Sequence, residues 1–193
     1  MNSACIFCGS SEGARPAYVG AAREMGAQMA RRGLTLIYGG GRVGLMGAVA
    51  DAALGEGGEV VGVMPEALVS KEISHEGLTK LHVVGSMHER KMLMNDLSDG
   101  FVALPGGFGT LEEFFEVLSW AQLGIHAKPC ALLDVDGFWE PLASLFDHAV
   151  DEGFVHPDHR SLVLTESDPA RLLDAMGRHS PPGTKKWLEP EEL

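Results

Sequence analysis

Short apolar runs alternate with longer amphipathic runs along most of this chain, and this alternation limits its fold more than any other feature. Runs such as Leu34–Tyr38 and Phe101–Leu104 have the length and composition of buried strands. The run Pro16–Arg32 opens on a proline and is followed by Gly33, a pattern typical of a helix. Strands that alternate with helices predict a mainly parallel sheet covered on both faces. We therefore expect a doubly wound α/β fold.

The same patterns give the expected elements along the chain. Residues 66–80 show no clear period and are predicted to form a loop with room for one helical turn. The predicted strands are Ala4–Cys8, Leu34–Tyr38, Val60–Met64, Leu81–Val84, Phe101–Leu104, Ala131–Leu133 and Leu162–Leu164. The predicted helices are Pro16–Arg32, Leu45–Leu54, Met87–Leu97 with Ser86 as N-cap, Leu111–Leu123 with Thr110 as cap, Trp139–Glu152 and Pro169–Met176.

The chain length suits one domain. With 193 residues it can bury a sizeable core but is short for two domains. We expect a single domain over residues 1–178 and a loose tail over residues 179–193, which contains Pro181, Pro182 and Gly183. The first residues lack a basic segment followed by a long apolar one, and no apolar run approaches the ~18 residues of a membrane span. These features predict a cytoplasmic protein.

The charge and the cysteines exclude several classes of function. The formal net charge of -12 repels nucleic acid and anionic membranes, so neither is expected as a partner. An anionic ligand would need a local positive site. Three cysteines do not make a disulfide framework. Cys5 and Cys8 fall within one predicted strand and point to opposite faces, which argues against a metal or redox pair.

The carboxyl ends of the strands are where ligands bind in such sheets. The most informative of these ends is Pro105-Gly-Gly-Phe-Gly-Thr, which runs into a predicted helix. Its glycines let the backbone approach a ligand, and the helix N-terminus adds free N–H groups and a positive dipole end. This loop predicts a phosphate site that needs neither a lysine nor a metal. A tight turn with a capping Thr110 is the plainer alternative.

Three further loops lie at the same predicted edge: Gly9–Ser11, Gly39–Gly44 and Gly85–Lys91. The second satisfies the G-x-G-x-x-G pattern, but no acidic residue ends the next strand, so a nicotinamide cofactor is not expected. We interpret Gly9, Ser10, Gly40 and Gly41 as a further part of the pocket.

The start of the third predicted helix supplies the local positive charge that an anionic ligand would need on this acidic protein. Arg90 and Lys91 open this helix directly after a strand, and arginine suits bidentate contact with phosphate or a base. An exposed basic turn is the alternative. His156 and His159 flank Pro157 and are expected to be solvated loop residues, not a metal pair.

Together these segments resemble the Lonely Guy family, the cytokinin riboside 5′-monophosphate phosphoribohydrolases, which are often mislabelled lysine decarboxylases. The segment Pro105–Glu113 matches the family signature P-G-G-x-G-T-x-x-E. The likeness extends over roughly residues 3–178. The other matching segments are Phe7–Ser11, Tyr38–Gly47, Met87–Lys91 and Trp120–His126.

The resemblance implies a Rossmann-like fold and a homodimer with active sites near the subunit interface. It implies cleavage of the base from adenosine-type 5′-monophosphates, with release of ribose 5-phosphate and no cofactor. The family's essential arginine falls on Arg90 and its signature glutamate on Glu113. The positions implied to bind substrate are Glu72, Met87, Lys91, Gly106, Gly107, Phe108, Gly109, Thr110, Leu111, Glu112 and Ser119.

The expected chemistry follows from the bond that breaks. Cleavage of the C1′–N9 bond builds positive charge on the ribose, which a carboxylate stabilises. We expect Glu113 in that role with Glu112 as its helper, and Arg90 beside the base. Whether the base carries an isoprenoid group on N6 is left open. A nucleotide-sensing protein without catalysis is the alternative; a decarboxylase would need a pyridoxal phosphate lysine, for which Lys91 and Lys128 are the nearest candidates.

Overall fold

The computed structural model describes residues 1–69 and 74–180 of the chain. In these residues the chain forms one seven-stranded parallel sheet in the order β4-β3-β2-β1-β5-β6-β7. The strands are β1 (Ser3–Phe7), β2 (Thr35–Tyr38), β3 (Val60–Pro65), β4 (Lys80–Val84), β5 (Phe101–Ala103), β6 (Cys130–Leu133) and β7 (Val163–Glu166). The helices are α1 (Pro16–Arg31), α2 (Gly44–Gly55), α3 (Glu66–Val69), α4 (Met87–Asp96), α5 (Phe108–Leu123), α6 (Glu140–Asp151), α7 (Pro157–Arg160) and α8 (Pro169–Gly177).

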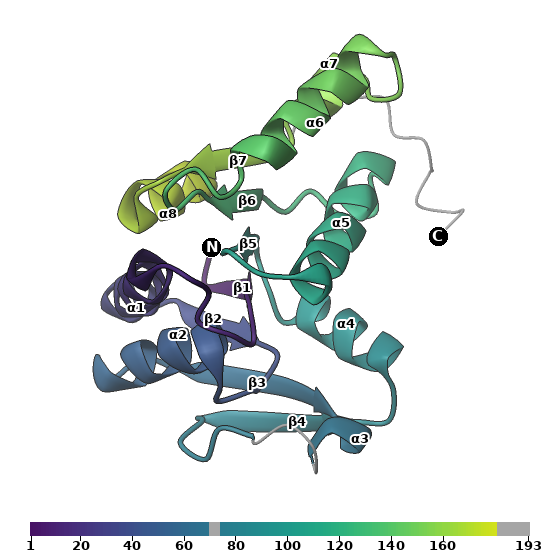
Figure 1. The fold of residues 1–193 in the computed structure, drawn as a ribbon. Coiled ribbons are helices and arrows are strands. Elements are labelled where there is room, and N and C mark those ends of the chain that lie inside the picture. The colour runs from purple at the N-terminus through teal and green to yellow at the C-terminus, as the bar shows by residue number, and fades with distance from the viewer. Residues whose placement is uncertain (70–73, 181–193) are drawn as a thin grey trace.

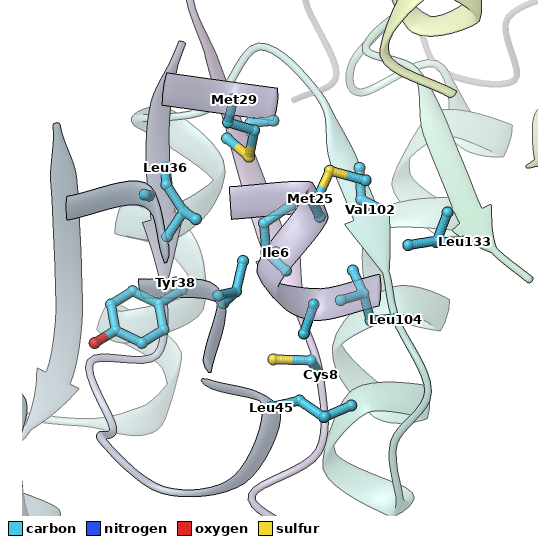
Figure 2. Close-up of a cluster of buried hydrophobic side chains, with 14 of the residues drawn as sticks. Ile6, Cys8, Met25, Met29, Leu36, Tyr38, Leu45, Val102, Leu104 and Leu133 are labelled. Carbon is cyan, nitrogen blue, oxygen red and sulfur yellow. The ribbon is translucent and has the colours of Figure 1, made fainter. Parts of the chain in front are cut away.

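Helices cover both faces of this sheet, which confirms the predicted α/β class. Figure 1 shows α1 and α2 on one side and α4 and α5 on the other. Each face has its own apolar core, because successive residues of a strand point to opposite faces. Ile6 and Cys8 pack with α1 and α2, whereas Cys5 and Phe7 pack with α4 and α5. Figure 2 shows the first of these cores, with Met25, Tyr38 and Leu45 around Ile6.

The closest helix contact on the first face depends on a glycine. Gly26 lies in the middle of α1 with its Cα against α2. A Cβ at this position would overlap the carbonyl oxygen of Val49 and lie 3.1 Å from the backbone nitrogen of Ala53. The missing side chain therefore sets how closely α1 and α2 can approach.

Predictions about two segments are corrected. The fourth predicted helix begins at Phe108, not Leu111, with Gly107 as N-cap, and Thr110 is a buried residue of the first turn. The chain after α6 forms a short helix, and His159 on it is only 9% exposed, so it is not a solvated loop residue. The predicted helical turn within residues 66–80 is confirmed as α3, and the predicted tail lies mostly outside the described residues.

The start of α4 and the end of α1 follow the sequence closely. Ser86 is the N-cap of α4, and its hydroxyl oxygen accepts a hydrogen bond from the Glu89 N–H at 3.1 Å. Gly33 follows α1 with a φ of 67°, a left-handed conformation that glycine adopts without strain. The strand order reverses between β1 and β5, and the helices that follow these two strands, α1 and α5, pack on opposite faces of the sheet. A sheet of this kind leaves a crevice at that point.

Candidate active site

The loop after β5 presents an open helix N-terminus at this crevice. No side chain caps the start of α5, and the Leu111 N–H makes the first helical hydrogen bond, to Gly107. The preceding N–H groups of the first turn are therefore available to an anion. A Cβ added at Gly107 or Gly109 would meet no atom within 4 Å, so these two glycines are not required by packing. They leave space in front of the helix end.

Gly106 has a different role from the other two glycines of this loop. A Cβ there would overlap the Thr110 hydroxyl and would lie 2.9 Å from the backbone nitrogen of Gly9. The Gly9 N–H donates to the Pro105 carbonyl at 3.1 Å and joins the two loops. Beside this junction lies a cavity of about 250 Å³ lined by Gly9, Ser11, Glu12, Tyr18, Gly107 and Phe138, among others. The loops after β1 and β5 thus form a single concave surface.

Arg90 is held from three sides on the face of the sheet that α4 and α5 cover. Its Nε donates to the Val63 carbonyl at 3.1 Å, and its Nη1 lies 3.2 Å from Glu113 Oε1. A Cβ on Gly39 would overlap Arg90 Nη2, so the glycine after β2 provides the space for the guanidinium. The structure therefore brings together Arg90 from α4 and Glu113 from α5, which lie 23 positions apart in the sequence.

Glu113 is nearly enclosed. Its side chain is 14% exposed and that of Arg90 13%. Burial raises the pKa of Glu113, and Glu112 and Glu116 add to the rise, while Arg90 and Lys91 oppose it. A carboxylate in this setting is poorly hydrated. It therefore interacts strongly with any positive charge that forms beside it.

Lys91 and Glu112 pair with each other. Lys91 Nζ lies 2.6 Å from Glu112 Oε1 and 2.9 Å from Glu116 Oε1. The hydrogen bond to Glu112, together with Glu116, raises the pKa of Lys91 although burial opposes the rise. The predicted helper Glu112 is 55% exposed and directed to Lys91, one helical position away from Glu113.

The other residues predicted to bind substrate or line the pocket are spread over α4, α5 and the loop after β2. Met87 borders the arginine, since its Sδ lies 3.4 Å from Arg90 Nη1, and Phe108 is 92% exposed at the first position of α5. Leu111 is half-buried against the core beside α5. Gly40 follows β2 with a φ of 83°, and Gly41 forms a bridge to Ser74.

Ser119 does not lie beside Arg90 and Glu113. Ser119 lies six residues after Glu113 on α5, its hydroxyl donates to the Phe115 carbonyl at 2.7 Å, and it lines a separate cavity between α5 and α6. Glu72 lies outside the described residues. Ser10 is exposed, and its backbone packs so closely on Gly44 that a Cβ there would overlap it.

The site depends on residues that the sequence did not single out. Val63 acts through its carbonyl, which no side-chain pattern could have identified. Glu116 could have been found, because it lies four residues after Glu112 and so shares its side of α5. Gly39 belonged to the glycine pattern, but the space that it leaves for the Arg90 guanidinium depends on the fold.

In the described parts of the chain, no group of three or more His, Cys, Asp or Glu residues is arranged to hold a metal ion. Nor does any helix there have the length and apolarity needed to cross a membrane.

Comparison with known proteins gives a consistent result. Residues 46–176 match the family model described as "Possible lysine decarboxylase". A cytokinin riboside 5′-monophosphate phosphoribohydrolase of Rhodococcoides fascians is 53% identical over 167 residues, which cover 86% of this chain and 84% of that protein. The rice protein LOGL9, named "Probable cytokinin riboside 5′-monophosphate phosphoribohydrolase", is 50% identical over 92% of this chain and 78% of its own length. Arabidopsis thaliana LOG1, a protein of the same name, is 44% identical over 98% and 91%.

Solved structures share the fold at lower identity. The molybdenum cofactor carrier protein of Chlamydomonas reinhardtii has a TM-score of 0.69 and 24% identity, covering 91% of this chain and 96% of its own. The molybdenum cofactor binding protein of Rippkaea orientalis has a TM-score of 0.68 and 22% identity, covering 91% and 94%. At this identity the likeness speaks for the architecture alone.

Proposed function

Because this chain belongs to the Lonely Guy family of cytokinin riboside 5′-monophosphate phosphoribohydrolases, we propose that it hydrolyses the N-glycosidic bond of N6-modified adenosine 5′-monophosphates. Water adds its oxygen to C1′ as the C1′–N9 bond breaks, and the base leaves with a proton. The products are the free base and ribose 5-phosphate. The observation that carries this proposal is the pairing of Arg90 with the enclosed Glu113 close to an uncapped helix N-terminus.

The phosphate is best bound by the start of α5. The open N–H groups there and the positive end of the helix dipole suit a dianion. Gly107 and Gly109 leave the space it needs, and Gly106 and Thr110 shape the loop behind it. Binding of the phosphate fixes the ribose next to the reacting groups, so energy from a remote contact lowers the barrier.

The bond cleavage is best assigned to Glu113 and Arg90. As the base leaves, C1′ and the ring oxygen gain positive charge, which the Glu113 carboxylate stabilises. The base gains electron density, which the Arg90 guanidinium accommodates by donating a hydrogen bond. In the free protein these two groups neutralise each other at 3.2 Å, so the substrate has to enter between them or beside them. Met87, Phe108 and Leu111 supply apolar surface near the entrance.

The residues do not fit the decarboxylase chemistry that the family-model description suggests. A lysine that forms a Schiff base must be available as a neutral amine. Lys91 is fixed between two carboxylates, and they raise its pKa. Burial lowers the pKa of Lys128, but this lysine donates to the Asn95 carbonyl at 2.7 Å, next to the start of β6 and away from the crevice. Neither lysine suits pyridoxal phosphate.

We further propose a cytoplasmic homodimer whose single domain spans residues 1–178. Several large apolar side chains are exposed around α4 and α5, which supports a second copy in this region. Met94 belongs to the core of the monomer, so only part of the methionine-rich helix is available for an interface. The exposed residues are Val83, Met87, Met92, Phe108, Phe115 and Ile125.

The test is chromatography of the products after incubation with matched substrates. N6-isopentenyladenosine 5′-monophosphate, AMP and the corresponding nucleosides are compared at equal concentration. We expect the 5′-monophosphates to lose their base and the nucleosides to be cleaved far more slowly. Equal rates for a nucleotide and its nucleoside contradict the phosphate site, and absence of any cleavage supports a nucleotide sensor. The ratio between the two nucleotides decides whether the isopentenyl group matters.

A further inference from the structure

Among the residues that the structure describes, Lys91 is a cation of the site that the proposed chemistry does not use. Its side chain is 12% exposed, and Glu112 and Glu116 occupy two of the three donor directions of its ammonium group. Both carboxylates belong to α5, whereas Lys91 belongs to α4. A lysine that serves a substrate phosphate would direct these donors to the ligand. The geometry here directs them to the neighbouring helix.

Three ion pairs, made by two adjacent cations, link α4 to α5. Arg90 reaches Glu113, and the next residue, Lys91, reaches the glutamates on either side of Glu113. Glu112 and Glu116 are four residues apart and lie on the same side of α5, so one ammonium group can contact both. A shift of α4 along α5 would stretch both links at once. The second link therefore restrains the first.

We propose that Lys91 is a positioning residue for the proposed reaction, which binds Glu112 and Glu116, fixes α4 against α5, and thereby holds Arg90 and Glu113 at their working separation. This inference rests on the proposed function, since that function assigns the work of the pair. It gives Lys91 a role other than the substrate contact that the family resemblance implies. Lys91 also places a positive charge near the carboxylate on which catalysis depends.

The charges around Glu113 make this role measurable. Arg90 and Lys91 face it from α4, Glu112 and Glu116 lie beside it on α5, and its charge acts on the buried thiols of Cys5 on β1 and of Cys8 just after β1. Burial raises the pKa of both thiols, so they stay neutral. Three carboxylates thus share two cations. Removal of Lys91 raises the pKa of Glu113 further, and removal of the Glu116 charge lowers it.

The experiment follows cleavage of a nucleoside 5′-monophosphate across pH for Lys91→Met, Lys91→Arg and Glu116→Gln. Lys80→Met is the matched control, because it removes the same charge from an exposed position on β4. Since a displacement of about 1 Å can cost roughly 100-fold, we expect Lys91→Met to lower kcat by roughly 10- to 100-fold with KM changed less than about twofold. Lys91→Arg restores most of the rate, and Lys80→Met behaves as the native protein.

The acid side of the pH profile separates positioning from simple loss of structure. Activity needs the ionised Glu113, so the acid limb moves to higher pH in Lys91→Met and to lower pH in Glu116→Gln. A Lys91→Met variant that raises KM strongly, keeps kcat and leaves the acid limb in place overturns the proposal. If Lys91→Met does not fold, Lys91→Arg and Glu116→Gln still give the kinetic comparison.

A second measurement keeps this inference distinct from the proposed function. Carbon-13 NMR of the glutamate carboxyl groups follows the ionisation of Glu113 without any turnover. If the native protein cleaves no nucleotide, the proposed function fails, yet the titration still tests whether Lys91 acts on Glu113. An unchanged Glu113 titration in both Lys91→Met and Glu116→Gln overturns the positioning role.

Discussion

Arg90 has little freedom to leave its place. The Val63 carbonyl holds one side of its guanidinium, Glu113 holds the other, and the backbone of Gly39 lies directly beside it. An arginine on a surface helix would ordinarily sample many rotamers. Here the order is imposed before a ligand arrives, so little entropy is lost when the substrate binds.

Gly39→Ala tests this restraint without touching either charged group. The new methyl group would overlap Arg90 Nη2, so the guanidinium must move. We expect kcat to fall by roughly 100-fold, since a misplacement of about 1 Å can have that effect. The control is Gly55→Ala, because a Cβ at Gly55 meets no atom within 4 Å. Unchanged turnover in Gly39→Ala would show that Arg90 need not be held.

The two groups of the reacting pair should differ in their kinetic signature. Glu113→Gln keeps the shape of the side chain and removes the charge that stabilises the transition state, so kcat should fall by about 10²–10³ with little change in binding. Arg90→Ala should weaken binding as well, because a guanidinium also contacts the ground-state nucleotide. Steady-state kinetics and calorimetric titration on the same preparations measure both effects. Near-normal turnover of Glu113→Gln would shift the catalytic assignment to Glu112.

The direction of the pH dependence follows from the burial of Glu113. Burial raises the pKa of this carboxyl above its ordinary value, and the carboxylate is the form that stabilises a cation. Activity should therefore be present above this pKa and be lost as the pH falls through it. A rate that stays constant down to the pH range of an ordinary exposed glutamate would argue against this assignment.

The sequence singled out the two residues that are proposed to react, but not their surroundings. Arg90 and Glu113 stood in recognisable motifs, and the glycines of the phosphate loop could be read directly. The second glycine motif did not reveal the space that Gly39 leaves beside Arg90. Lys91 bonds to Glu112 and Glu116, which lie 21 and 25 positions further along the chain. Such contacts depend on how two helices pack, which no local pattern encodes.

At the scale of elements, the crossover from β4 to β5 shapes the site. Helix α4 leaves the edge strand of the sheet and precedes a strand beyond β1, so it passes over the middle of the sheet (Figure 1). Its first turn therefore lies close to β3 and to α5 rather than at the edge. This is how residues 90 and 113, each at the start of a helix, come to face one another.

The start of α5 shows where reasoning from local preference fails. Glycine is a poor helix former, so the sequence placed the start after Gly109. The helix begins three residues earlier because Leu111 bonds back to Gly107. The short helix α7 was missed for a related reason, since four residues are too few to show a period. In contrast, the strands and the longer helices were found within a few residues of their bounds.

The packing of α1 on α2 makes a prediction about stability. Gly26→Ala places a methyl group where the Val49 carbonyl oxygen lies, so the helices must separate. Overpacking of this kind typically costs about 1–3 kcal/mol in the free energy of unfolding, or roughly 2–4 °C in Tm per kcal/mol for a domain of this size. Gly20→Ala in the same helix meets no neighbouring atom and serves as control. Thermal unfolding of the two variants compares them directly; equal Tm values contradict the role of Gly26.

At the scale of the whole molecule, the exposed apolar residues near the site bear on assembly. Met92 is 49% exposed on α4, and Met87 is 43% exposed five residues before it. We expect light scattering to give about twice the 20.6 kDa of one chain. Met92→Glu should shift the mass toward the monomer and lower activity, because a charge in an apolar interface is poorly solvated. Ala17→Glu at an exposed position of α1 is the control, and an active native monomer would exclude the dimer.

The passage of α4 across the sheet also divides the chain into two pieces that need each other. Everything up to α4 builds β1 to β4 and carries Arg90, while the later part builds β5 to β7 and carries Glu113 with the phosphate loop. Neither piece alone holds both residues of the proposed reacting pair. If the chain were cut between Ser98 and Gly100, release of the base would appear only after the pieces reassociate. Under the proposed function, release of the base would therefore report that the two half-sheets have joined along β1 and β5.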